Sequence, residues 1–222
     1  MNTIKKDQTI WIIIPFICML LALKGYGIYF RYGVAASCGL ILCLVYGRNV
    51  KKDVWLVVAA FLFSIVGDWF LAHRKGIPVR FIYGVVFYFV AHLGYLWFSL
   101  KNGTIRKWVL SCVLVAYLAF FFLMIVPKIN DNILIVTVFC YLLISCFSLA
   151  AATGLRLPKI PKWLFVAGIA SIVFSDTIIA FHEFVRYKNL SFLIMPTYYL
   201  SHILISLALT LNSEPETRNP KL

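Results

Sequence analysis

Charge is scarce in this sequence, and acidic charge is scarcer still. Only 13% of its 222 residues are charged, with 8 Asp or Glu against 21 Lys or Arg. Because 63% of the residues are hydrophobic, a soluble domain of this length has too little polar surface to cover them. This composition excludes an ordinary water-soluble enzyme and indicates a protein whose solvent is lipid.

Several common signatures are also missing. The six cysteines form no CxxC pair and fall inside apolar stretches, where they indicate packing and no disulfide framework. No glycine-rich phosphate loop occurs, and we expect no metal or organic cofactor. The basic residues lie between apolar stretches and not in one patch, which argues against a nucleic-acid partner. No protein partner is evident, and the oligomeric state stays open.

Long apolar stretches are what the sequence has in abundance. A bilayer core about 30 Å thick needs roughly 20 apolar residues per helix. We therefore predict an all-α membrane protein, as a single domain over residues 1–211. Its eight transmembrane helices are expected at residues 9–23, 28–47, 54–73, 81–100, 108–126, 132–152, 163–184 and 192–211. The polar, proline-containing segment 212–222 is expected to be a disordered cytoplasmic tail.

The basic residues indicate the orientation of the chain. The first stretch is short, but no clear cleavage site follows it, so it is kept as a membrane helix. With the N-terminus inside, more Lys and Arg fall on the inner side than on the outer, which favours cytoplasmic termini in a bacterial cytoplasmic membrane. The inner residues are Lys5, Lys6, Arg48, Lys51, Lys52, Lys101, Arg106, Lys107, Arg156, Lys159, Lys162, Arg218 and Lys221.

Two short motifs occur twice in the same order. SIVGD at 64–68 returns as SIVFSD at 171–176, and YFVAH at 88–92 returns as YYLSH at 198–202. The copies lie about half the chain apart. In each half, the second motif lies on the span that directly follows the span of the first. The repetition predicts two four-helix repeats, about 1–105 and 106–211, that run in parallel through the membrane.

Ionisable side chains inside the spans are the strongest functional signal. Asp68 and Asp176 lie within about 7 Å of the midpoints of their spans, and His92 and His202 within about 2 Å. Charged groups at this depth are costly and face a protein interior or a watery cavity. Helical spacing adds further polar residues to the same faces, namely Ser64, Tyr88, Tyr95, Ser99, Tyr198 and Ser206. Each of these residues also has a structural reading, as a hydrogen-bonding link between helices.

Two carboxyl groups close together in a low dielectric cannot both ionise cheaply. One keeps its proton and can act as an acid, while the other can act as a base or stabilise a cation. Glycosidases use such a pair across an oxocarbenium-like transition state. An enol ether reaches a related cation when a proton adds to its β-carbon, so the same pair suits its hydrolysis.

The motifs together resemble the YhhN family of membrane proteins. They are S-x-x-G-D at 64–68, FVAHLGY at 89–95, the Ser175–Asp176 pair and Y-Y-x-x-H at 198–202. The resemblance covers essentially the whole chain and implies a lysoplasmalogenase, which splits the vinyl ether of a lysoplasmalogen into a fatty aldehyde and a glycerophospho-alcohol. Asp68, Asp176 and His92 match characteristic family positions, whereas His202 stands where many members have Gln.

Our hypothesis gives Asp68 and Asp176 the catalytic roles of acid and base, without deciding which is which. His92, Tyr88 and Tyr95 from one half, and His202 and Tyr198 from the other, would orient an aspartate or the water, with Ser64 one turn before Asp68. The substrate would be a lysophospholipid lying in the bilayer. Its phosphate would be held by three basic residues, Arg74, Lys75 and Arg80.

Three other classes of protein share some of these features. An intramembrane aspartyl protease also uses two aspartates, but Ile65 breaks its G-x-G-D motif. A zinc-dependent lipid hydrolase would use the two aspartates and the two histidines as ligands. A proton-coupled small-molecule or lipid transporter would suit parallel halves around a polar centre. The spans that carry the aspartates lack the proline breaks that often mark transporter sites.

Overall fold

A computed structural model describes residues 10–47 and 53–213 of the chain. All regular elements in this part of the chain are helices, and it has no strands. The main helices are α2 (Ile13–Leu23), α3 (Ile28–Tyr46), α4 (Val54–Ala72), α5 (Pro78–Lys101), α6 (Lys107–Phe120), α7 (Asn132–Thr153), α8 (Lys159–Ala180) and α9 (Ile194–Asn212). Two π-helical turns, Phe121–Ile125 and Phe181–Val185, extend α6 and α8, and 3-10 turns lie at Val126–Lys128 and Ser191–Leu193.

Seven of the predicted spans are confirmed as helices that are long and apolar enough to cross a membrane. Two of them start several residues earlier than predicted, α5 at Pro78 and α8 at Lys159. Proline suits the first turn of a helix because its missing N–H is not needed there, and Pro78 therefore opens α5. The sequence pattern had placed these starts at the first long apolar run.

The prediction of a first span at 9–23 holds only in part. The described helix α2 has 11 residues, so it extends about 16 Å, roughly half of a bilayer core. The predicted tail began one residue too early, because Asn212 still belongs to α9. Residues 214–222 lie outside the described residues. So do Lys5, Lys6, Arg48, Lys51, Lys52, Arg218 and Lys221, on which part of the orientation rests.

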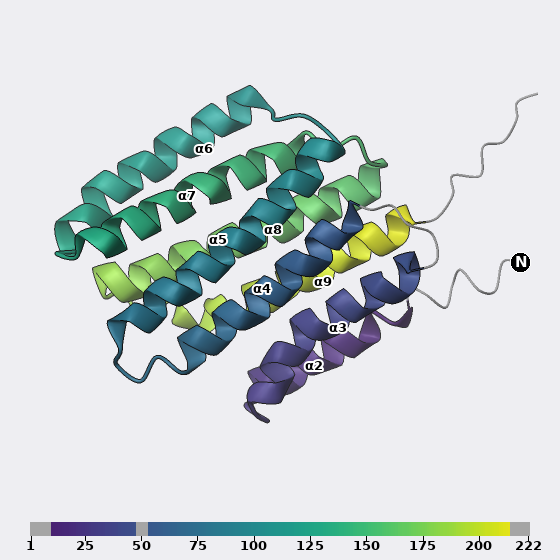
Figure 1. The fold of residues 1–222 in the computed structure, drawn as a ribbon, viewed down its shortest axis with the longest axis horizontal. Helices are drawn as coiled ribbons and strands as arrows, with labels where there is room; N and C mark the ends of the chain where they lie inside the picture. Colours follow the sequence, from purple (N-terminus) through teal and green to yellow (C-terminus); the bar gives the residue numbers. More distant parts are fainter. Residues whose placement is uncertain (1–9, 48–52, 214–222) are drawn as a thin grey trace, which may run out of the picture.

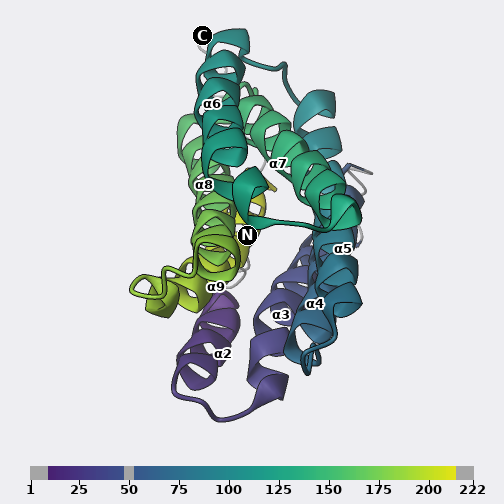
Figure 2. The same ribbon diagram turned by 90° about the vertical axis from the view of Figure 1, so that its left-hand side faces the viewer.

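The helices form an elongated bundle with two central pairs and two outer pairs. Seen along the bundle, the α4–α5 pair faces the α8–α9 pair, with α2 and α3 at one edge and α6 and α7 at the other (Figure 2). The pairs are joined crosswise, since α3 packs on α9 and α5 packs on α7. The start of α2 and the end of α9 lie at the same end of the bundle (Figure 1).

The outer surface of this bundle differs from that of a soluble protein. Large apolar side chains such as Val115, Leu123 and Phe192 are at least 70% exposed, which fits a surface covered by lipid. The interior has an apolar core, and polar residues are buried within it. The buried ones are Ser64, His92, Ser99, Ser145, Ser148, Ser175, Ser201, His202, Ser206 and Thr210. Small polar residues allow close helix packing in membranes.

Candidate active site

Asp68 lies near the C-terminal end of α4 and is held by the neighbouring helix. The hydroxyl of Tyr88 on α5 donates a hydrogen bond to Asp68 Oδ1 at 2.5 Å. Gly67 makes room for this contact, because a Cβ atom there would lie 2.9 Å from the Tyr88 ring. The G-D pair of the motif therefore places a carboxyl group and clears the path of its hydrogen-bond donor.

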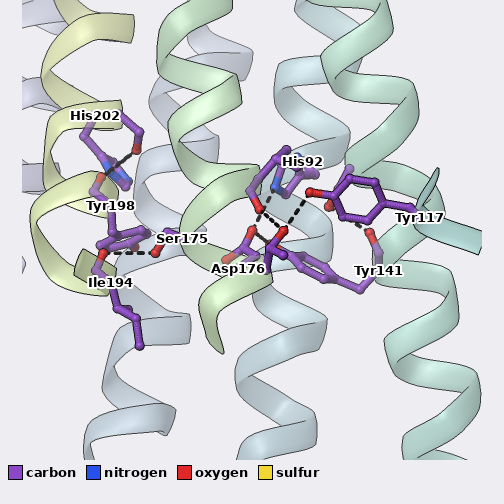
Figure 3. Close-up of polar contacts among 12 residues, drawn as sticks. His92, Tyr117, Tyr141, Ser175, Asp176, Ile194, Tyr198 and His202 are labelled. Carbon is purple, nitrogen blue, oxygen red and sulfur yellow. Dashed lines mark hydrogen bonds and ion pairs between the residues drawn. The ribbon is translucent and has the colours of Figure 1, made fainter. Parts of the chain in front are cut away.

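Asp176 on α8 has a different set of partners. The Tyr141 hydroxyl on α7 donates a hydrogen bond to Asp176 Oδ2 at 2.5 Å. His92 Nε2 on α5 lies 3.8 Å from the same oxygen, and its ring packs against that of Tyr141. Figure 3 shows Asp176 between these two side chains. Three helices thus meet at one carboxyl group.

Both aspartates line one cavity of about 180 Å³ between the two central helix pairs. The predicted juxtaposition of Asp68 and Asp176 is therefore present, although the two motifs lie in different halves of the sequence. The other lining residues are Arg31, Tyr32, Leu71, Ala72, Tyr88, Ser175, Ile179, Ile194, Met195, Tyr198 and Tyr199. Smaller apolar cavities of about 50 and 60 Å³ reach Asp176 from other sides.

The two predicted supporting residues of α9 fall on different sides of the site. Tyr198 lines the aspartate cavity, and its ring lies 6.1 Å from that of Tyr88. Its buried hydroxyl has no hydrogen-bond partner among the described residues. His202 is turned away, with Nδ1 3.0 Å from the Tyr198 carbonyl oxygen and its ring packed on Phe61. Figure 3 shows His202 well apart from Asp176.

Ser64 and Tyr95 are buried but do not line the aspartate cavity. Tyr95 packs its ring against His92 and Phe61, and its hydroxyl has no partner among the described residues. Their position fits packing between α4 and α5 beneath the site. Only His92 connects this layer to a carboxyl group.

The three basic residues predicted to hold a phosphate do not line this cavity. Arg74 forms an ion pair of 2.7 Å with Glu183, at the end of the bundle where α4 joins α5. Arg80 donates a hydrogen bond to the His73 carbonyl oxygen. Lys75 occupies the α4–α5 turn with a left-handed backbone, φ 41°. Two of the three are therefore already engaged within the protein.

The sequence prediction missed two site residues on α3 and a third on α7. Arg31 and Tyr32 line the aspartate cavity, yet neither is among the candidate site residues predicted from the sequence. Tyr141 is also absent from that set, and it proves to be the donor to Asp176. A signal was present, because Phe30-Arg31-Tyr32 and Phe139-Cys140-Tyr141 form the same F-x-Y pattern about half the chain apart.

The arrangement suits acid–base chemistry on an uncharged bond. Two carboxyl groups that line one cavity, each with its own tyrosine donor, can give and take a proton on either side of a small reacting group. Among the described residues, no group of three or more His, Cys, Asp or Glu side chains is arranged to hold a metal ion.

Fold and site together define a multi-pass, all-helical membrane protein with a cavity lined by two aspartates. The model of the YhhN family matches residues 29–209, and the chain belongs to the YhhN family, as its motifs had indicated. Lysoplasmalogenase TMEM86B of Rattus norvegicus is 30% identical over 177 residues, which cover 78% of this chain and 70% of the rat protein. No solved structure matches the chain significantly.

Proposed function

We propose that this protein hydrolyses the vinyl-ether bond of a lysoplasmalogen within the membrane. The observation that carries the proposal is the cavity that both Asp68 and Asp176 line, each hydrogen-bonded to a tyrosine hydroxyl. The name of the rat relative supports the same reaction. Lipid-facing apolar helices around the cavity suit a substrate that arrives from the bilayer.

The reaction begins with transfer of a proton from an aspartic acid to the β-carbon of the vinyl ether. The double bond becomes a single bond, and the positive charge spreads over the α-carbon and the ether oxygen. Water then attacks the α-carbon and loses a proton to the second carboxylate, which gives a hemiacetal. The hemiacetal collapses as its hydroxyl proton passes to the leaving glycerol oxygen, which gives a fatty aldehyde and the glycerophospho-alcohol. One water is consumed, and transfer of the proton from the second carboxyl group to the first restores the starting state.

We assign water activation to Asp176 and protonation of carbon to Asp68. His92 lies beside Asp176 and can share the proton that water releases, which suits a base. Asp68 is hydrogen-bonded by the Tyr88 hydroxyl and has no such imidazole beside it. Arg31 lines the same cavity, but a guanidinium keeps its proton and cannot act as a base. Tyr88 and Tyr141 then act as positioning residues, because each fixes one oxygen of its carboxyl group.

The cavity accommodates only part of a lipid. At about 180 Å³ it is smaller than the roughly 300–1,000 Å³ pockets that enclose whole ligands. It has room for the glycerol and the vinyl ether, so the hydrocarbon chain has to lie elsewhere. The smaller apolar cavities beside Asp176, lined by residues such as Val138 and Ala180, would take its first carbons.

Turnover in heavy water tests this chemistry directly. Purified protein in detergent is given a lysoplasmalogen in D2O. The aldehyde is reduced at once to the alcohol, and the deuterium content of the alcohol is measured by mass spectrometry. We expect one deuterium on the carbon next to the aldehyde group, because that carbon receives the catalytic proton. Aldehyde without this deuterium would refute protonation of the double bond, and no aldehyde from folded protein would refute the activity.

We also propose that the bundle consists of two parallel four-helix repeats, with both termini in the cytoplasm of a bacterium. The crosswise packing supports the repeat, since α3 on α9 corresponds to α7 on α5, and α4 on α5 to α8 on α9. The excess of basic residues on one side supports the orientation. A reporter fused after residue 222 tests the orientation, and we expect it to be active in its cytoplasmic form only.

A further inference from the structure

The wall of the aspartate cavity includes one basic residue that the mechanism does not use. Arg31 lies in the first turn of α3 and lines the cavity together with Asp68 and Asp176. Among the described residues it forms no ion pair and no side-chain hydrogen bond, unlike Arg74 at the same end of the bundle. An unpaired guanidinium at the wall of a reaction cavity is free to bind a ligand.

The surroundings of Arg31 place it where lipid headgroups lie. Tyr26 and Tyr29 precede it and are 66% and 85% exposed, and Trp69 on α4 is 45% exposed. Exposed tyrosine and tryptophan side chains at helix ends are typical of the membrane–water interface. Arg31 is therefore close to the level of lipid phosphates, and it lines the same cavity as the two aspartates at this end of the bundle.

The fold itself does not require an arginine at this position. In the matching F-x-Y segment of the second half, the residue between Phe139 and Tyr141 is Cys140, which is exposed. The hydroxyl of Tyr32, the next residue along, is buried without a partner among the described residues, as is that of Tyr198 across the cavity. One cation and two hydroxyl groups without a partner among the described residues thus belong to residues that line the same cavity, from α3 and α9.

We propose that Arg31 binds the phosphate ester of the substrate headgroup and so places the vinyl ether between the two aspartates. A guanidinium binds phosphate oxygens through two parallel hydrogen bonds, and the tyrosine hydroxyls can donate to the remaining oxygens. Arg31 is a specificity-determining residue in this account and takes no part in proton transfer. The inference rests on the proposed hydrolysis, which supplies its readout.

The test compares two vinyl-ether substrates that differ only in the phosphate. One is a lysoplasmalogen, and the other is the 1-alkenylglycerol that lacks the headgroup. We expect Arg31→Gln to raise KM for the lysoplasmalogen about 10- to 100-fold, as loss of a charge-assisted pair would, and to leave the alkenylglycerol unchanged. Arg31→Lys should lie between, because it keeps the charge without the two parallel bonds.

The matched control is Arg186→Gln, an exposed arginine that does not line the cavity, and it should behave as the wild type. Equal losses on both substrates in Arg31→Gln would overturn the proposal, because Arg31 would then support the aspartates themselves. Unchanged kinetics on both would overturn it too, with the hydrolysis intact. Failure of the wild type on both substrates would instead refute the hydrolysis.

A second arm separates a lipid headgroup from free phosphate. Inhibition of alkenylglycerol turnover is measured with a 1-alkyl lysophospholipid, which lacks the double bond, and with inorganic phosphate. We expect the lipid to inhibit the wild type strongly and Arg31→Gln weakly, with little inhibition by phosphate alone. Equal inhibition by inorganic phosphate, lost in Arg31→Gln, would overturn the headgroup assignment.

Discussion

The two aspartates have different partners although their motifs match. Asp68 is bonded by a tyrosine from the helix that follows it, and Asp176 by a tyrosine from the helix that precedes it. The sequence repeat would have paired Asp176 with Tyr198, whose hydroxyl instead stays without a partner among the described residues. Such a difference gives the two carboxyl groups distinct surroundings, which an acid and a base require.

Removal of either tyrosine hydroxyl should weaken catalysis without unfolding the protein. Tyr88→Phe and Tyr141→Phe each delete one hydrogen bond to a carboxyl group, worth about 1.5–3 kcal/mol if the group is charged. We expect kcat/KM for the lysoplasmalogen to fall about 10- to 100-fold in each variant. The control is Tyr83→Phe on α5, which is 48% exposed and should keep full activity. Wild-type rates in both site variants would contradict these positioning roles.

The same substitution should lower activity at one of the two buried histidines and leave it nearly unchanged at the other. His92→Gln removes the imidazole 3.8 Å from Asp176, and we expect a loss of about 100-fold in kcat. His202→Gln changes a residue that faces the Tyr198 backbone and Phe61, so activity should stay within about threefold of the wild type. Thermal unfolding in detergent separates a local effect from misfolding. Greater inactivation by His202→Gln would show that the roles are reversed.

Two glycines on the contact face between α4 and α5 allow the two helices to approach each other closely. A Cβ atom at Gly67 would press on the Tyr88 ring, whereas one at Gly94 would lie 2.7 Å from the Leu56 carbonyl oxygen. A side chain can shift more easily than a backbone. The first contact therefore governs where a functional hydroxyl points, and the second governs how closely the helices pack.

Alanine at these two glycines should separate function from stability. We expect Gly67→Ala to displace Tyr88 and to lower kcat/KM about 10-fold with little change in Tm. Gly94→Ala should force α4 and α5 apart and cost about 1–3 kcal/mol of stability. Activity assays and thermal unfolding of both variants measure the two expected effects, on kcat/KM and on Tm. A lower Tm for Gly67→Ala than for Gly94→Ala would contradict this division.

The helices were easier to predict from the sequence than their contacts. Apolar run length located seven long helices, because a bilayer requires that length whatever the packing. It could not indicate that His92 turns toward Asp176 while His202 turns toward its own backbone, since both share the same helical spacing. Arg31 was missed because an arginine near a helix end usually points to water. Only the packing of α3 beside the aspartates brings it to the cavity.

At the scale of the whole molecule, neither half is expected to be complete alone. Each contributes one aspartate to the cavity, and α5 of the first half packs on α7 of the second. Chains split between residues 105 and 106 should therefore copurify when expressed together and recover hydrolysis. Either half alone should be inactive, as judged by aldehyde release. Activity in a single half would contradict a shared site.

The most direct measurement of the central claim is a double-mutant cycle on the two aspartates. Asp68→Asn, Asp176→Asn and the double variant are assayed for aldehyde release from one lysoplasmalogen. If the carboxyl groups act as a unit, each single variant loses at least about 100-fold, and the double variant is about as slow as the slower single variant. Losses that multiply in the double variant, or near-normal rates in either single variant, would contradict joint action of the two aspartates.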